Sequence, residues 1–302
     1  MYNKRLDKVD FKTEFKSDEY DKVYYAYLDD VVGYIKKAYL GITLTNGEVL
    51  KFYNITKMPE DSQQAIESAI NYNYDTVSSV TIPNTVTAIN ESALIFAWNV
   101  KNLTIPASVE QFGSEESGLG PFLISDDGGE GPQIETVEFL GENTKLGRNA
   151  FYYCLDLSGV TLPSNLTEIP EYCFDRCIKL TSIELPSTLQ TIGSQAFYGT
   201  AFRSITIPYP VTEIGHAAFE DCRNLTSVAL PSSLQVIGSY AFSQTDLRTI
   251  VIPDSVTEIG NDAFQSCSNL TEIYYKGSAI DEYNDHWGAT NATLITNYST
   301  LL

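Results

Sequence analysis

The stretch Leu180-Thr-Ser-Ile-Glu-Leu-Pro-Ser-Thr-Leu-Gln-Thr-Ile-Gly-Ser-Gln-Ala-Phe197 decides the fold, because close variants of it recur along most of the chain. It contains the phrase Ile183-Glu-Leu-Pro186, in which two apolar residues alternate with a polar one before a proline. Clear copies of this phrase lie at residues 80–83, 103–106, 160–163, 183–186, 205–208, 228–231 and 250–253, and degenerate copies at 137–140 and 273–276. From Leu140 onward its last position returns every 22 or 23 residues. A fixed period of this length predicts a solenoid, in which each unit buries its apolar face against its neighbours.

Three further positions keep their character from unit to unit. Eleven residues after the proline position stands a large apolar residue, which is Leu94, Phe151, Phe174, Phe197, Phe219, Phe242 or Phe264. The residue before it is small, and an aliphatic residue precedes both at Ile89, Leu146, Ile169, Ile192, Ile214, Ile237 and Ile259. Alternate side chains of a strand point to one face. We therefore predict that each unit is a coil with a strand, a turn at the proline, a second extended segment, a bend carrying the phenylalanine, and a return.

All five cysteines occupy repeat positions. Four of them follow the phenylalanine by three residues, at Cys154, Cys177, Cys222 and Cys267, and two shorter coils have Thr200 and Thr245 there. Cys173 takes the small position instead, so Cys173 and Cys177 fall at two different inward positions and do not form a converging zinc pair. An odd number of cysteines also disfavours a complete set of disulfides. We expect a buried column of small side chains with free thiols.

The quoted stretch resembles the BspA-type leucine-rich repeat, whose pattern is L-x-x-I-x-L-P-x-x-L-x-x-I-G-x-x-A-F-x-x-C-x-x-L. The similarity covers roughly residues 76–276. The pattern does not cover the first 75 residues, and in the third coil Leu140-Gly141 replaces the proline motif. The resemblance implies a curved solenoid of the kind found in cell-surface and secreted proteins of host-associated bacteria and some protists. It also implies a role in adhesion or protein binding, without catalysis.

The predicted fold is a leucine-rich-repeat solenoid, mostly β with short turns, in which about nine stacked coils of 22–23 residues form a curved parallel sheet. With strands about 4.8 Å apart, that sheet extends roughly 40 Å. The predicted organisation is a polar segment or linker remnant at 1–20, a small α+β cap at 21–75, the solenoid at 76–276 with an inserted loop at 113–133, and a second cap at 277–302.

The N-terminal cap is predicted to contain a hairpin and a short helix. Apolar residues alternate on both sides of Asn46-Gly47 between residues 39 and 53, which is typical of a hairpin. Residues 59–70 predict the helix, with acidic residues in its first turn. The tyrosines at positions 20–34 are expected in the cap core, with a carbohydrate or peptide platform as the alternative. At the other end, Tyr283, Trp287 and the tail to Leu302 are expected to close the last coil.

The outward positions of the anchor strands are mostly small and polar. Binding hot spots favour Trp, Tyr and Arg, and among these positions only the last coil supplies one. A partner on this face therefore has to fit a flat surface rich in threonine and serine, and the alternative is a purely scaffolding sheet. The candidate binding residues here are Thr81, Thr104, Glu138, Thr161, Glu184, Thr206 and Tyr274.

The repeat is interrupted once. Pro106 and Leu140 are 34 positions apart instead of 23, and the extra residues lie on both sides of Phe122, the predicted equivalent of the coil phenylalanine. Insertions of this composition form surface loops, often at the binding face of a solenoid. The acidic residues Glu115, Glu116, Asp126 and Asp127 are therefore candidate partner contacts. Their spacing does not match an EF-hand loop, so calcium binding is the less favoured alternative, and a plain solvent loop is the other.

The charge of the chain limits its partners. The 302 residues include 39 acidic and 19 basic ones, for a net charge of −20. Phosphate backbones and anionic lipids repel such a chain, so neither nucleic acid nor a membrane surface is an expected partner. No membrane-spanning segment and no signal peptide are visible. A location at the cell surface or outside the cell therefore follows from the resemblance alone.

The residues offer little for catalysis. The chain has two histidines, and His216 falls where other coils have Ser194, Ser239 and Asn261, so it is expected to face solvent. Nucleophile, phosphate-loop, zinc and dinucleotide motifs are missing. We expect no enzyme, cofactor, metal or small-molecule ligand, but a scaffold that binds another protein or a host or matrix macromolecule. The alternatives are a structural spacer that presents other modules, and a carbohydrate-binding module that uses the N-terminal aromatic residues.

Overall fold

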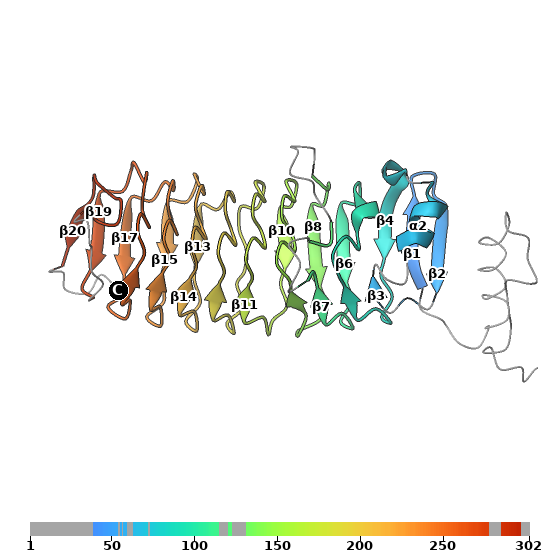
Figure 1. Ribbon diagram of the computed structural model, residues 1–302, viewed down its shortest axis with the longest axis horizontal. Helices are drawn as coiled ribbons and strands as arrows, with labels where there is room; N and C mark the ends of the chain where they lie inside the picture. The colour runs from blue at the N-terminus through green and yellow to red at the C-terminus, as the bar shows by residue number, and fades with distance from the viewer. Residues whose placement is uncertain are drawn as a thin grey trace, which may run out of the picture.

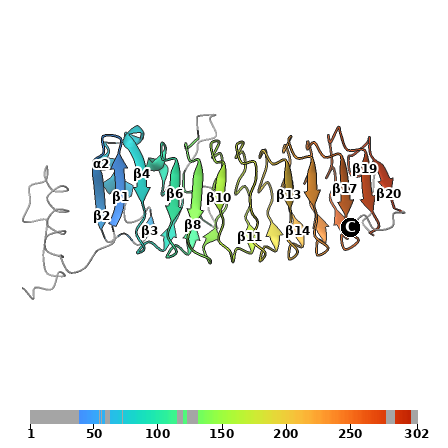
Figure 2. The same ribbon diagram turned by 180° about the vertical axis from the view of Figure 1, so that it is seen from behind.

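The computed structural model describes residues 39–53, 55, 57–58, 63–71, 73–114, 120–122, 131–277 and 285–296. Over these residues the chain winds into an elongated stack of coils whose strands lie across the long axis (Figure 1). The N-terminal strands and helix, in blue, form one end and the C-terminal strands, in red, form the other, as the view from behind also shows (Figure 2). The predicted β-solenoid with little helix is confirmed.

The elements are short and follow one another in repeating pairs. The strands are β1 (Tyr39–Leu44), β2 (Val49–Tyr53), β3 (Lys57–Met58), β4 (Val77–Thr81), β5 (Ala88–Ile89), β6 (Asn102–Ile105), β7 (Gln111–Phe112), β8 (Thr136–Phe139), β9 (Lys145–Leu146), β10 (Gly159–Thr161), β11 (Glu168–Ile169), β12 (Thr191–Ile192), β13 (Ser204–Thr206), β14 (Glu213–Ile214), β15 (Ser227–Ala229), β16 (Val236–Ile237), β17 (Thr249–Ile252), β18 (Glu258–Ile259), β19 (Glu272–Tyr275) and β20 (Thr293–Ile295). The helical elements are α2 (Gln63–Ala69), η3 (Tyr74–Thr76) and η4 (Ile95–Ala97). We number the coils 1 to 9 by their anchor phrases, from residues 80–83 to residues 273–276.

The anchor strands form the front face of the stack, but not as one sheet. Strands β6, β8 and β10 pair in parallel, β13 pairs with β15, and β17, β19 and β20 form a third group. The anchor of coil 5, at 183–185, forms no strand, so the predicted single sheet is divided. Strands β6 to β19 on this face have only three or four residues. Because the proline that ends most of them has no N–H to donate, few hydrogen bonds hold each pair.

The second extended segments form a face of their own, with longer ladders. Strands β3, β5, β7 and β9 pair in parallel, and so do β11, β12, β14, β16 and β18. The glycine that follows the aliphatic residue in most coils allows the coils to approach closely. The Gly193 N–H donates to the Ile169 oxygen at 2.8 Å, and a Cβ at Gly193 would lie 2.7 Å from the Glu171 nitrogen. Any side chain at this position would therefore push the coils apart.

The bend at the phenylalanine connects the coils a third time. The Phe174 N–H donates to the Ala196 oxygen at 2.8 Å, and the Phe197 N–H donates to the Ala218 oxygen at 2.9 Å. Two residues of each bend in coils 3 to 8 adopt the left-handed conformation, as Gln195 (φ 52°) and Gly199 (φ 67°) do in coil 5. Non-glycine residues pay a cost in this conformation, and the regular hydrogen bonds between coils offset it.

A column of phenylalanine rings fills the interior of the stack. The rings of Phe151, Phe174, Phe197, Phe219, Phe242 and Phe264 are fully buried. Neighbouring ring centroids are 5.1 to 5.9 Å apart, with interplanar angles of 1° to 16°. Phe122 is only 3 % exposed, and the Leu94 N–H donates to the Pro121 oxygen at 2.7 Å. Pro121 therefore occupies the position that small residues such as Ala196 hold in other coils, just before the phenylalanine. This confirms Phe122 as the coil phenylalanine of coil 2.

The five cysteines are free and buried, as predicted. The thiols of Cys177, Cys222 and Cys267 donate to backbone oxygens of the preceding coil at 3.2, 3.1 and 3.0 Å. The Thr200 and Thr245 hydroxyls continue the column, each 3.2 Å from the sulfur of the next coil. Burial raises the pKa of these thiols, that of Cys222 to about 12. The column is therefore structural and poor in reactive thiolate.

The N-terminal cap closes both faces of the first coil. Strands β1 and β2 form the predicted antiparallel hairpin, with Leu40 opposite Phe52. Strand β1 also pairs antiparallel with β4 on the front face, and β3 pairs with β5 on the second face. Helix α2 is described from Gln63 onward. The first residues of the predicted helix, 59–62, and the tyrosines at positions 20–34 lie outside the described residues.

The C-terminal end adds a strand that the sequence analysis did not predict. Strand β20 pairs in parallel with β19 and extends the front face beyond the ninth anchor. Trp287 is 5 % exposed, and its backbone oxygen accepts a hydrogen bond from the Phe264 N–H at 3.0 Å. Its ring lies 5.8 Å from that of Tyr275. Tyr283 and the tail after residue 296 lie outside the described residues.

The phenylalanine column predicts a large cost for emptying one position. The Phe197 ring is fully buried against Phe174, Phe202 and Phe219, with centroid distances of 5.3 to 5.4 Å. Phe197→Ala should lower the free energy of unfolding by about 3–5 kcal/mol, because a cavity replaces the ring. Urea unfolding measures this loss, and the exposed Thr206→Ala is the control, with a change within about 0.5 kcal/mol. A loss below about 1 kcal/mol for Phe197→Ala would contradict a packed column.

The cysteine column predicts an all-or-none thiol titration. Because all five thiols are free and buried, a thiol reagent should react with none of them in the folded chain. It should count five in denaturant without reductant. A count of three or one would show disulfides, and rapid reaction in the native state would show that the column is open to solvent.

Candidate functional site

The predicted front-face residues are exposed, apart from the half-buried Tyr274, but strand pairing does not run continuously through them. Thr81, Thr104, Glu138, Thr161, Glu184 and Thr206 are exposed and Tyr274 is half-buried. Strand pairing places Thr104 and Thr161 on either side of Glu138. In contrast, Glu184 lies in the unpaired anchor of coil 5. The acidic loop residues Glu115, Glu116, Asp126 and Asp127 lie outside the described residues.

The groups considered for catalysis do not converge. His216 is exposed, as predicted, and its ring lies 5.7 Å from that of Tyr240. Over the ranges that the structure describes, no group of three His, Cys, Asp or Glu side chains gathers to hold a metal ion. Within the same ranges, none of the helices has the length and apolar character needed to cross a membrane.

The second face has a break between coils 3 and 4, and one proline explains it. Strand β9 ends one ladder and β11 begins the next. In coil 3 the Gly147 N–H donates a hydrogen bond to the Phe112 oxygen of coil 2 at 2.7 Å. The equivalent bond in coil 5 runs from the Gly193 N–H to the Ile169 oxygen of coil 4. Coil 4 has Pro170 at this position. Since proline lacks an N–H and its ring needs space, the Leu146 oxygen loses this bond and the two coils separate locally.

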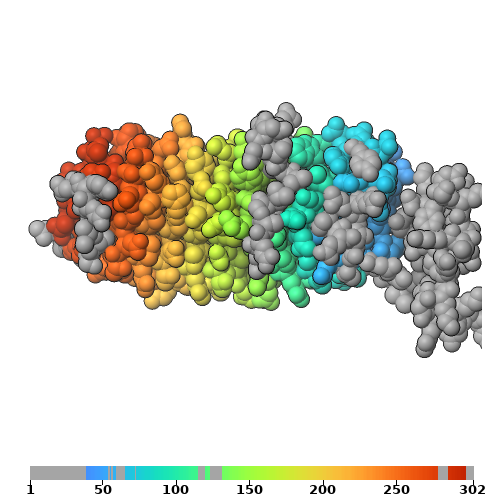
Figure 3. All heavy atoms as spheres, in the orientation of Figure 1, coloured from blue at the N-terminus to red at the C-terminus, as the bar shows by residue number. Residues whose placement is uncertain are grey.

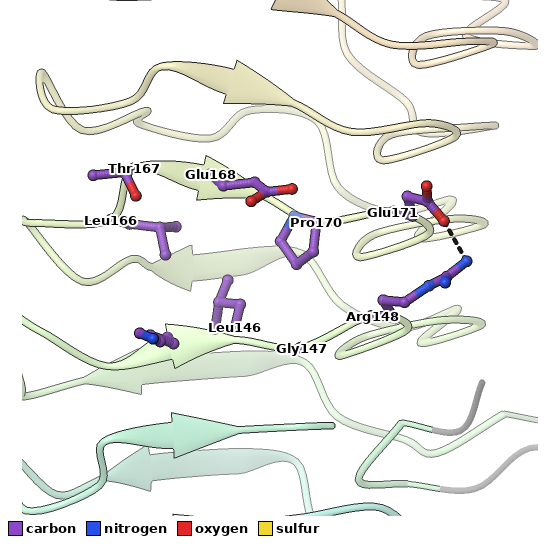
Figure 4. Close-up of a pocket in the computed structure, with 9 residues that line it drawn as sticks. Leu146, Gly147, Arg148, Leu166, Thr167, Glu168, Pro170 and Glu171 are labelled. Atoms are coloured by element: carbon purple, nitrogen blue, oxygen red, sulfur yellow. Dashed lines mark hydrogen bonds and ion pairs between the residues drawn. The ribbon is translucent and has the colours of Figure 1, made fainter. Parts of the chain in front are cut away.

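A groove of about 440 Å³ opens at this break. It is lined by Lys145, Leu146, Gly147, Arg148, Leu166, Thr167, Glu168, Pro170 and Glu171. Figure 4 shows the leucines and Pro170 between the stacked strands, with the Arg148 and Glu171 side chains paired at one end beside the bend. Oppositely charged groups thus flank an apolar floor, and the groove ends where the bend residues begin.

The bends of coils 3 to 5 carry the aromatic surface that the front face lacks. We define the tyrosine patch as Tyr152, Tyr153, Tyr172, Asp175, Arg176 and Tyr198. Its tyrosines and Arg176 are half-buried, so part of each side chain is open to solvent. The Arg176 guanidinium lies 5.2 Å from the centre of the Tyr198 ring and 6.0 Å from that of Tyr153. The Tyr152 and Tyr153 ring centroids are 5.4 Å apart.

The patch contains a buried acid that lacks a partner. Asp175 is 6 % exposed, and its Oδ1 atom accepts no hydrogen bond. Tyr152 and Tyr198 hold the same repeat position in the coils on either side of Asp175. Burial raises the pKa of Asp175 to about 7, and the positive charge of Arg176 offsets only part of this shift. A buried, unpaired acid is costly and is often part of a functional site.

The sequence analysis passed over this patch. Among the variable positions of the bend, the sequence prediction covers only that of His216. The available signal was the row of tyrosines one and two residues after Phe151, together with Asp175 and Tyr198 one residue after the next two coil phenylalanines. The break at Pro170 was also visible as the loss of the glycine that follows Leu146, Ile192 and Ile214.

The Asp175 environment predicts a pH-dependent effect of one substitution. From about pH 4 to 7 the folded chain keeps a proton on Asp175 that the unfolded chain has released, so this residue lowers stability as the pH rises through that range. Asp175→Asn removes the charge. Its free energy of unfolding relative to wild type should rise between pH 5 and pH 8, by on the order of 2–4 kcal/mol. Urea unfolding at the two pH values tests this, and an equal difference at both would contradict a buried, unpaired carboxylate.

A family model supports the repeat architecture. The family model described as the BspA type leucine rich repeat region matches residues 49–116 and 144–271, in 6 copies. A search of curated proteins finds no match. Among solved structures, a leucine-rich repeat protein from Bacteroides ovatus is 21% identical, with 86% of this chain and 76% of that chain covered and a TM-score of 0.36. The leucine-rich repeat protein of T. pallidum is 23% identical, with 63% and 72% covered and a TM-score of 0.45.

A further solved structure, of a leucine rich cell surface protein from Faecalibacterium prausnitzii, is 16% identical, with 89% of this chain and 95% of that chain covered and a TM-score of 0.32. The family model alone spans more than half of the chain. It covers the stacked coils on both sides of the insertion, where the inward isoleucine, phenylalanine and cysteine positions have been described above. The chain therefore belongs to the BspA-type leucine-rich repeat family.

Proposed function

We propose that this protein is a non-catalytic scaffold at the cell surface or outside the cell that binds another protein or a host matrix macromolecule. The observation that carries the proposal is the rigid repeat itself. Up to three sets of backbone contacts hold neighbouring coils together, and the coils expose a long surface without placing reactive groups together in the ranges that the structure describes. Figure 3 shows these coils as successive bands along one elongated body.

The regular front face supports binding by complementarity. Its exposed threonines and glutamates stand at fixed strand spacing, as Thr104, Glu138 and Thr161 do in register. The pattern of a partner's polar groups can match such an array over a considerable length. We therefore propose the front face as one contact surface, together with the acidic loop residues of the insertion.

The charge of the chain selects the partner. With a net charge of −20, the surface attracts basic proteins and repels polyanions, and this attraction weakens as salt screens it. A membrane anchor or a further domain in the full-length precursor would favour a spacer role alongside binding.

The proposal predicts salt-sensitive protein binding. The folded chain, probed against an array of purified matrix proteins, bacterial surface proteins and glycans, should bind at least one protein. Its affinity should fall several-fold when the ionic strength rises from about 0.05 to 0.5 M, because a Debye length of about 10 Å at 0.1 M shrinks further. The heat-unfolded chain is the control. The absence of binding to every protein and glycan on the array would contradict the proposal.

A further inference from the structure

The coil geometry makes the tyrosine patch a fixed surface. The bend ladder joins its members through the backbone, with the Tyr153 N–H donating to the Asp175 oxygen at 2.9 Å and the Arg176 N–H donating to the Tyr198 oxygen at 2.8 Å. The side chains one residue after the phenylalanine therefore stand in one column, and those two residues after it stand in the next. Rings held this way lose little freedom when a partner binds, which lowers the cost of association.

The repeat does not require these residues. Tyr152, Asp175 and Tyr198 stand in the column one residue after the phenylalanine. In this column, coils 6 to 8 have Glu220, Ser243 and Gln265. In the next column the same coils have Asp221, Gln244 and Ser266. The bends of those coils have left-handed residues at the same two positions, and they form the same backbone hydrogen bonds to the next coil. The tyrosines and Arg176 are therefore dispensable for the fold, and they are the residue types that dominate binding hot spots.

The chemistry of the patch favours a cation. The Oδ1 atom of the Asp175 carboxylate is buried and accepts no hydrogen bond. Burial raises the pKa of Tyr198, and the negative charges of Asp221 and Glu220 from coil 6 raise it further, although Arg176 opposes them. The phenol thus stands in a negative field at one edge of the patch. Aromatic faces next to a carboxylate are a setting in which lysine and arginine side chains bind.

We infer that the tyrosine patch is a docking surface for a basic segment of a protein partner, and that a lysine or arginine of this segment reaches the Asp175 carboxylate. This inference deepens the proposed function and rests on it. The positive charge of the partner side chain would lie beside the Asp175 carboxylate, whose Oδ1 atom is buried without a hydrogen-bond partner, and so offset part of the energy that Asp175 costs the free protein. The groove at Pro170 is lined by Glu171, which directly precedes Tyr172 of the patch in the chain.

The variants for the test come from the chain itself. Tyr198→Ser and Tyr153→Gln introduce the residues that coil 7 carries at the same two positions, Ser243 and Gln244. Asp175→Asn keeps the shape and removes the charge. Tyr209→Ser is the matched control, because Tyr209 is 72% exposed and lies in the turn after the coil 6 anchor, away from the bend.

The experiment selects binders from a displayed library of random 12-residue peptides against the full chain, followed by affinity measurements with the synthesised peptides. The selected peptides should be enriched in lysine and arginine. They should lose about tenfold or more in affinity for Tyr198→Ser, Tyr153→Gln and Asp175→Asn, and less than about twofold for Tyr209→Ser. Circular dichroism and urea unfolding of each variant show that the fold is retained.

The outcomes separate the two proposals. Selected peptides that bind the patch variants as tightly as wild type, or that carry no basic residues, would overturn the inference and leave protein binding intact. A glycan that binds the wild-type chain and loses affinity for the patch variants, with no peptide selected, would also overturn it. If neither the library nor the protein array yields a binder, both proposals fail together.

Discussion

The whole structure depends on the contact between one coil and the next. Backbone hydrogen bonds fix the coil spacing at the bend, as the Phe174 N–H to Ala196 distance of 2.8 Å illustrates. The same spacing brings the phenylalanine rings into near-parallel stacking 5.1 to 5.9 Å apart. No coil could bury its phenylalanine alone, so each gains its stability from its neighbours. This dependence also explains why anchor strands of three or four residues, and even an anchor without strand pairing in coil 5, are sufficient.

Departures from the repeat gather in coils 3 to 5. Pro170 removes a ladder bond, Asp175 is buried without a partner for one oxygen, and tyrosines replace the polar residues that later coils carry in the bend. Pro170 and Asp175 each cost stability, whereas the coils on either side keep the regular hydrogen bonds of the bend. Proteins tend to retain such local costs where a function needs them. The concentration of costly and aromatic residues on one short part of the rod is therefore the physical basis for placing a binding surface there.

Most of the fold could be predicted from the sequence because every coil repeats the same inward residues. The period located the phenylalanine column, the free cysteines and Phe122 inside the insertion. The second ladder and the bend ladder were harder to foresee. They rest on backbone hydrogen bonds, and several left-handed residues of the bend, such as Gln195 and Tyr240, are types that carry no strong turn signal. The tyrosine patch was missed for a different reason, since a period emphasises what recurs, whereas this surface is made by residues that do not.

The central claim, that the bends hold the coils together, is tested most directly by native-state hydrogen exchange. The amides of Phe174, Phe197, Phe219 and Phe242 donate to the next coil, so the account predicts that they exchange only through global unfolding, with the slowest rates in the chain. The exposed amide of Glu184, in the unpaired anchor of coil 5, should exchange much faster. Phenylalanine amides that exchange as fast as Glu184 would contradict the account.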